Sequence, residues 1–82
     1  MLQINLDDLR RILREAAGAD EGTDLDAEIL DHTFIELGYD SLALLETAGR
    51  IEREYHVALD DAVVVEAETP RALLDVVNAQ LA

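Results

Sequence analysis

Apolar side chains recur with the period of an α-helix in three long segments of the sequence. In the first segment they fall on one face, at about 100° per residue, and predict a helix over residues 6–16. Asn5 is a preferred N-cap residue, and Gly18 is a natural stop after the last turn. The opposite face carries Arg10, Arg11 and Arg14. We interpret this basic face as solvated, with a small contact patch for an acidic surface as the alternative.

The second periodic segment predicts a helix from about Ser41 to Tyr55, with Asp40 as its N-cap. One apolar stripe has the width of a core face and comprises Leu44, Ala48, Ile51 and Tyr55. A second stripe, centred about 130° away, comprises Leu42, Leu45 and Gly49. A thin domain cannot easily bury both stripes, so we expect the second one to be exposed and to dock a partner. The alternative is that the long loop before this helix covers it.

The remaining segments are also helical or irregular. Thr69-Pro70 is a strong helix start, because a capping hydroxyl precedes proline at the first helical position, and apolar residues follow. An aspartate pair precedes the apolar run 62–65, which we assign to one or two helical turns. A long connection spans residues 19–39, and its scattered apolar side chains indicate that it is pinned across the helices. We expect part of residues 27–37 to be helical.

The sequence shows no strand-like alternation and no internal repeat. We therefore predict one all-α domain over residues 1–82. It is expected to be a small bundle of three longer helices and one short helix, with a long loop between the first two helices.

Composition and charge exclude several classes of partner. The 82 residues are 50% apolar, yet 19 acidic residues against 6 basic ones give a net charge of −13. Such a balance argues against binding nucleic acid, whose phosphates need Lys and Arg, and against docking on anionic lipid. No apolar run approaches the ~18 residues of a membrane span, and the first residues lack the features of a signal peptide. We expect a cytoplasmic protein.

Few residues of this chain could support catalysis. The sequence has no Cys and no Lys, which removes thiolate and lysine chemistry. A nucleophile elbow needs glycine two residues on each side of its serine, whereas Tyr39 and Ala43 stand at these positions around Ser41. His32 and His56 have no spacing typical of a triad, and we interpret them as surface or capping residues. We therefore expect that the protein is not an enzyme.

The acidic stretch 20–31 is the strongest candidate for a metal site in the sequence. A calcium loop of the EF-hand type needs Gly at its sixth position and Glu at its twelfth. This chain has Leu25 and Asp31 at those positions, so we expect no specific metal site.

Ser41 is the only serine of the chain, and it stands directly after a turn, at the start of the second predicted helix. We expect its hydroxyl to be exposed. A phosphate ester at this position would meet free backbone N–H groups and the positive end of the helix dipole. The alternative, equally open from the position alone, is that Ser41 is simply a helix-capping residue.

The segment Leu37-Gly-Tyr-Asp-Ser-Leu42 resembles the Asp-Ser-Leu motif of acyl carrier proteins. The tripeptide alone is a weak motif, but it is specific at the start of the second helix of a short, acidic, helical chain. The longer string from Leu37 to Ala48 is most similar to the free-standing carriers of type II (aromatic) polyketide synthases. The Thr69-Pro-Arg opening of the last helix fits the same family, so the resemblance covers nearly the whole chain.

The resemblance implies a carrier that catalyses nothing itself. A phosphopantetheinyl transferase would move 4′-phosphopantetheine from coenzyme A onto Ser41, and the terminal thiol of this cofactor would hold acyl groups as thioesters. A malonyl acyltransferase would load the carrier. The carrier, expected to be a monomer, would then serve a ketosynthase and chain-length-factor pair and tailoring enzymes such as a ketoreductase or a cyclase.

The resemblance also implies roles for individual side chains. Carriers of this family meet basic patches of their enzymes at positions near the serine and along the exposed apolar stripe. In this chain these positions are Asp40, Leu42, Leu45, Glu46 and Glu52. Arg53 departs from the acidic residue common in fatty-acid carriers, so partner choice is expected to differ. Arg71 and Asn78 match polar positions thought to face the cargo, with plain surface residues as the alternative. His56 stands where polyketide carriers usually have Gly.

Two other functions stay open from the sequence. One is a carrier of fatty-acid synthesis, which the string around Ser41 and the scarcity of acidic residues after Glu52 in that helix disfavour. The other is an acidic helical adaptor that only binds other proteins, with Ser41 as a helix cap.

Overall fold

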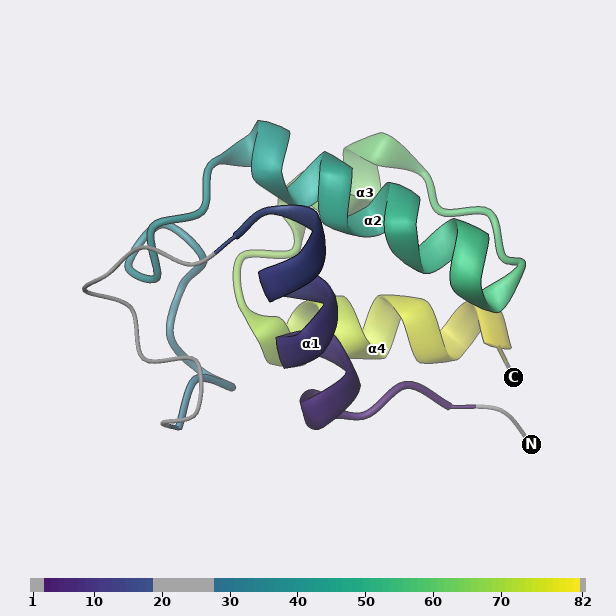
Figure 1. Ribbon diagram of the computed structural model, residues 1–82, viewed down its shortest axis with the longest axis horizontal. Coiled ribbons are helices and arrows are strands. Elements are labelled where there is room, and N and C mark those ends of the chain that lie inside the picture. The colour runs from purple at the N-terminus through teal and green to yellow at the C-terminus, as the bar shows by residue number, and fades with distance from the viewer. Residues whose placement is uncertain (1–2, 19–27, 82) are drawn as a thin grey trace.

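Within the described residues, the chain folds into four α-helices (Figure 1). The computed structural model describes residues 3–18 and 28–81. The helices are α1 (Leu6–Ala16), α2 (Ser41–Tyr55), α3 (Asp61–Glu66) and α4 (Pro70–Leu81). The predicted architecture, three longer helices and a short one with a long loop between the first two, is confirmed, and the described residues contain no strand.

The helices pack in a crossed arrangement around one core. In Figure 1, α2 lies above α4, α1 lies across the front of both, and α3 lies at the upper back. Contacts join α1 to α2 and α4, and α3 to the same two helices. Each helix contributes the apolar face that its sequence periodicity predicts: Leu9, Ile12 and Leu13 from α1, Leu44, Ala48 and Ile51 from α2, Val64 from α3, Leu73 and Val77 from α4.

The helix starts are determined by short-range side-chain caps. The Asn5 side chain accepts a hydrogen bond from the Asp8 N–H (2.9 Å), and the Asp8 carboxylate accepts one from the Asn5 N–H (3.2 Å). This reciprocal pair is a capping box. Asp40 caps α2 by accepting a hydrogen bond from the Ala43 N–H (2.9 Å), and the Thr69 hydroxyl accepts one from the first turn of α4. All three predicted N-caps are confirmed.

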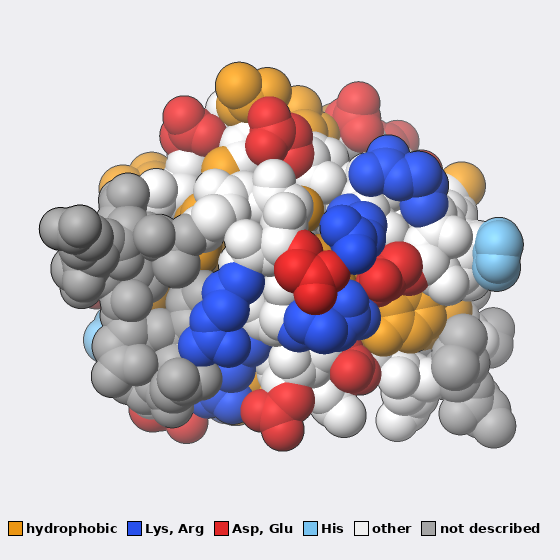
Figure 2. Space-filling model, in the orientation of Figure 1, with side chains coloured by type: hydrophobic (Ala, Val, Ile, Leu, Met, Phe, Trp, Pro, Cys, Tyr) orange, Lys and Arg blue, Asp and Glu red, His pale blue; other side chains and the backbone are white. Residues whose placement is uncertain are grey.

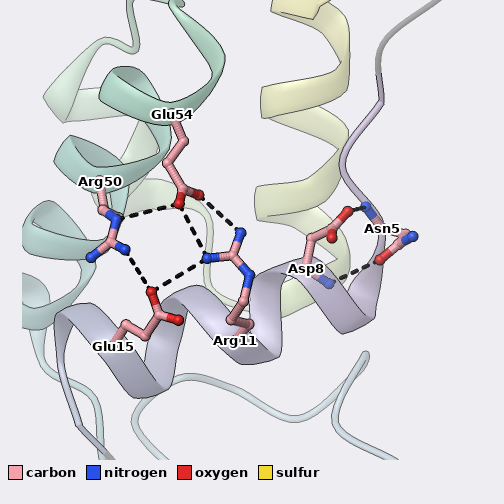
Figure 3. A network of polar contacts seen from close by, with 6 residues as sticks. All are labelled: Asn5, Asp8, Arg11, Glu15, Arg50 and Glu54. Atoms are coloured by element: carbon pink, nitrogen blue, oxygen red, sulfur yellow. Dashed lines mark hydrogen bonds and ion pairs between the residues drawn. The ribbon is translucent and has the colours of Figure 1, made fainter.

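The interface between α1 and α2 contains a network of ion pairs (Figure 3). Arg11 forms two hydrogen bonds with the carboxylate of Glu54, at 3.1 and 3.0 Å, and a longer one with Glu15 at 3.4 Å. Arg50 reaches Glu15 and Glu54 from α2. Arg11 is exposed, as the prediction of a solvated basic face requires, but its ion pair with Glu54, 43 residues away on another helix, was not expected from the sequence.

The connection between α1 and α2 is held by contacts with distant parts of the chain. The Phe34 N–H donates to the Glu68 carbonyl (2.8 Å), and the Arg71 N–H donates to the Leu30 carbonyl (3.0 Å). Phe34 and Ile29 are buried, as expected for a pinned loop. The loop is therefore tied to the start of α4 and to the linker before it. Leu25 and most of the acidic stretch 20–31 lie outside the described residues.

The expectation of a helix within this connection was wrong. The described part of the connection, residues 28–40, contains turns but no helix, because backbone donors such as the Phe34 N–H bond to other segments. In α2, Tyr55 is half-buried and packs against the core, as expected, and Thr47, which the predicted core face did not include, is fully buried. The Thr47 hydroxyl donates to the Ala43 carbonyl (2.9 Å), which satisfies it within the core.

Candidate functional site

Ser41 is the first residue of α2 and is exposed to solvent. The N-cap of this helix is Asp40, whose side chain accepts the hydrogen bond from Ala43. Within the described residues, the Ser41 hydroxyl and the backbone N–H groups of Ser41 and Leu42 make no hydrogen bond. Ser41 is therefore not the capping residue. Its hydroxyl is free and lies next to free backbone donors.

The backbone before Ser41 is fixed by a buried tyrosine. Tyr39 is 5% exposed, and its hydroxyl donates to the Gly18 carbonyl at the end of α1 (2.9 Å). Its N–H donates to the Phe34 carbonyl (2.8 Å). Gly38 has φ +90°, a value that glycine adopts without strain, and so allows the chain to turn into Tyr39. Ser41 is thus held at a defined place, two residues from an anchored side chain.

A groove of about 350 Å³ opens beside Ser41. Its walls come from the turn before α2, from α2 itself and from α3, and they are largely apolar, with Phe34, Leu44 and Val65 among them. Asp40 and Glu68 supply carboxylates to the lining. A linear group attached to the serine oxygen would therefore begin at the edge of an apolar groove.

The predicted recognition residues near Ser41 lie on the surface. Asp40 and Glu46 are exposed, and Leu42 is 64% exposed. Leu45 is half-buried and lines a second hollow of about 430 Å³ between the end of α1 and α2. The second apolar stripe of α2 is therefore fully open only at Leu42, and α1 flanks its other end.

Glu52 differs from the other predicted recognition residues. It is partly buried, and its carboxylate accepts a hydrogen bond from the Leu59 N–H (3.3 Å) in the loop after α2. This bond gives Glu52 a structural role. Arg53, one residue further, is exposed and lines the same hollow as Leu45.

Arg71 and Asn78 are engaged with other parts of the chain. Arg71 forms two hydrogen bonds with Asp31, at 2.8 and 3.2 Å, and this pairing raises the pKa of Arg71 and lowers that of Asp31. The Asn78 side chain accepts from the Ile4 N–H (2.8 Å) and donates to the Ile4 carbonyl (3.1 Å). In the part of the chain that is described, neither residue lines the groove beside Ser41.

The remaining candidates form no chemical site within residues 3–18 and 28–81. No group of three His, Cys, Asp or Glu side chains there could hold a metal ion. His32 is exposed, with its Nδ1 3.5 Å from a Glu36 carboxylate oxygen, and His56 is the exposed C-cap of α2. None of the helices described is long and apolar enough to cross a membrane.

Comparisons with known proteins agree with this geometry. Residues 7–77 match the family model of the phosphopantetheine attachment site. The granaticin polyketide synthase acyl carrier protein of Streptomyces violaceoruber is 60% identical over 78 residues, which cover 95% of this chain and 92% of that protein. Solution structures of the actinorhodin carrier of Streptomyces coelicolor, as its 3,5-dioxohexyl and holo forms, superpose with TM-scores of 0.88 and 0.84. Each is 50% identical and covers 98% of this chain and 93% of its own.

Proposed function

The chain belongs to the acyl carrier proteins of type II polyketide synthases, and on this premise we propose that Ser41 is the residue that carries 4′-phosphopantetheine. A protein of this family is a non-catalytic carrier of intermediates tethered through phosphopantetheine. The observation that supports Ser41 is its exposed hydroxyl, free of hydrogen bonds in the described structure, at the first position of α2. Ser41 is also the only serine of the chain.

The described residues fit a phosphodiester at this position. The unpaired N–H groups of Ser41 and Leu42 and the positive end of the α2 dipole would face its negative oxygens. On attachment, the Ser41 Oγ forms a bond to phosphorus while the pyrophosphate bond of coenzyme A breaks. The hydroxyl proton passes to the transferase, and 3′,5′-ADP leaves. The arm supplies the thiol for thioester chemistry, which a chain without cysteine cannot provide.

The partners follow from this proposal. Interaction with polyketide synthase enzymes is implied by the family. More specifically, we propose a phosphopantetheinyl transferase, a malonyl acyltransferase, a ketosynthase with its chain-length factor, and tailoring enzymes, each visited by a monomeric carrier in the cytoplasm. The exposed carboxylates of Asp40 and Glu46 beside the exposed Leu42 favour partners with a basic rim around an apolar contact.

Cargo contact by Arg71 and Asn78 stays a prediction. A cargo carbonyl would have to displace Asp31 from Arg71, or the Ile4 backbone from Asn78. The groove beside Ser41 requires no such displacement, and its apolar walls would suit the hydrocarbon part of the arm or of a short cargo.

Intact mass measurement tests the attachment residue. The protein is incubated with coenzyme A and a promiscuous phosphopantetheinyl transferase. We expect the mass to rise by one phosphopantetheine group in the wild type and to stay unchanged in Ser41→Ala. Thr33→Ala is the matched control, because Thr33 carries another hydroxyl in the lining of the same groove. This variant should still gain the full mass at the end of the reaction, although its rate can differ because the Thr33 hydroxyl accepts a hydrogen bond from the Glu36 N–H. A folded wild type that gains nothing, or a Ser41→Ala variant that still gains mass, contradicts the proposal.

A further inference from the structure

Ile35 is the most exposed large apolar side chain of the described residues, at 83%. Its neighbour Phe34 is 2% exposed and belongs to the core. A single exposed apolar side chain is ordinary on a protein surface, so a role for Ile35 has to follow from where it lies relative to the serine. Replacing Ile35 with a polar residue should not reduce the stability of the isolated chain, because the side chain buries little surface.

The exposure of Ile35 does not come from a loose loop. The Thr33 N–H donates to the Glu36 carboxylate (3.0 Å), and the Glu36 N–H donates back to the Thr33 hydroxyl (3.1 Å). The Leu37 N–H bonds to the Thr33 carbonyl, and the Gly38 N–H bonds to the Ile35 carbonyl, at 3.1 and 3.0 Å. The turn of residues 33–38 is therefore closed on itself and holds Ile35 outward.

The position of Ile35 relates it to the serine. Ile35 lines the same groove as Ser41, and Leu42, at 64% exposure, directly follows Ser41 in α2. Exposed carboxylates of Glu36 and Asp40 lie on the same two segments. In Figure 2, apolar side chains are exposed at the top of the molecule, over the start of α2, with acidic side chains on both sides. The serine thus lies between two apolar contact points within an acidic border.

We propose that Ile35 supplies a second apolar contact, beside the recognition residue Leu42, and that the phosphopantetheinyl transferase buries it when it modifies Ser41. The inference rests on the proposed function of Ser41. The transferase has to bring phosphorus within about 3–3.5 Å of the serine oxygen, so its surface must cover the residues next to that oxygen. Enzymes that act on the thiol at the far end of the arm have no such constraint. The complementary surface on the transferase is an apolar pocket bordered by Arg or Lys side chains.

Modification rates of matched variants test this contact. A broad-specificity phosphopantetheinyl transferase and coenzyme A are mixed with each variant, and kcat/KM is taken from intact masses at successive times. Ile35→Ser should lower kcat/KM about tenfold, through KM, because Ile35 binds the enzyme without touching the reacting atoms. Ile35→Val should retain most of the wild-type value. Val63→Ser is the control, since Val63 is exposed (42%) on α3 and does not line the groove.

The outcomes separate this inference from the function on which it rests. If neither the wild type nor any variant is modified, the attachment at Ser41 is contradicted. Modification of Ile35→Ser at the wild-type rate overturns the contact alone, as does an equal loss in Val63→Ser. The thermal midpoint of Ile35→Ser should equal that of the wild type. A clear fall would show that Ile35 supports the fold and would also overturn the proposal.

Discussion

At the scale of single residues, His56 carries a conformational cost that the sequence alone indicated. It is the only non-glycine residue with a positive φ in the described chain, at φ 55° and ψ 48° on the C-cap of α2. The left-handed conformation costs a residue with a Cβ roughly 1–2 kcal/mol, and glycine avoids that cost but loses more chain entropy on folding. The resemblance to polyketide carriers had already marked Gly as usual at this position.

We therefore expect His56→Gly to raise the free energy of unfolding by about 0.5–1 kcal/mol. Chemical denaturation measures it as a higher midpoint with an unchanged m-value. His32→Gly is the control, because His32 is also exposed but its φ is not positive, and it should show no gain. A His56→Gly variant no more stable than the wild type would mean that the imidazole itself stabilises the end of α2, for example through the helix dipole.

Individual site residues were predictable only where the determining contact is local. The cap by Asp40 involves a partner three residues away, so sequence spacing sufficed to place the start of α2 and the serine. The bonds of Asn78 to Ile4 and of Arg71 to Asp31 span 74 and 40 residues. Such pairings depend on how the helices cross, and no spacing rule reports them. The exposure of Ile35 was missed for the same reason, since it depends on the Phe34 anchor.

At the scale of elements, the ion-pair network fixes α1 against α2 at one end of their contact (Figure 3). Hydrogen bonds from Arg11, and then its charge, lower the pKa of the Glu54 carboxyl below its ordinary value of 4.5, and Arg50 adds to this effect. A carboxyl whose pKa is lower in the folded state stabilises the fold above its unfolded pKa. That stabilisation is lost as the pH falls through the folded pKa.

We expect Glu54→Gln to be less stable than the wild type at pH 7, because the guanidinium of Arg11 loses its charged partner. The difference should narrow as the pH falls below 4.5 and vanish once Glu54 is protonated in both states. Denaturant midpoints measured at several pH values test this. Glu46→Gln is the control on the same helix, since Glu46 is exposed and has no ion pair in the described structure. The stability difference between this variant and the wild type should not narrow in the same way as the pH falls. A Glu54→Gln difference that is independent of pH would show that packing, and not charge, is responsible.

The helices themselves were predictable because periodicity and caps are properties of short segments. Leu9, Ile12 and Leu13 face the core as their spacing requires, and the short α3 begins after its Asp60 cap. The connection between α1 and α2 was less predictable. Its backbone donors bond to residues that lie beyond any local window, so the expected helix within it did not form.

At the scale of the whole molecule, the net charge of −13 is unevenly compensated. The described ion pairs of arginine lie on α1, α2 and the start of α4, where Arg10, Arg11, Arg50 and Arg71 find carboxylates. Figure 2 shows arginine side chains gathered on one face among acidic ones. The turn before α2, the first turn of α2 and α3 carry no basic residue other than His32, so uncompensated negative charge gathers around Ser41.

Because of this charge distribution, added salt should have opposite effects on thermal stability and on the modification of Ser41. Salt screens the repulsion among the carboxylates, so the thermal midpoint should rise between about 0.05 and about 0.5 M NaCl. Salt also weakens the exposed ion pairs, but these contribute little to stability. Replacing Asp61 and Glu66, both exposed and without ion pairs in the described structure, by Asn and Gln should make that rise smaller.

The same salt should lower kcat/KM for modification of Ser41, because the acidic border then attracts a basic transferase less strongly. A thermal midpoint that does not respond to salt would show that repulsion does not limit stability. The field around the serine would then act on partners alone.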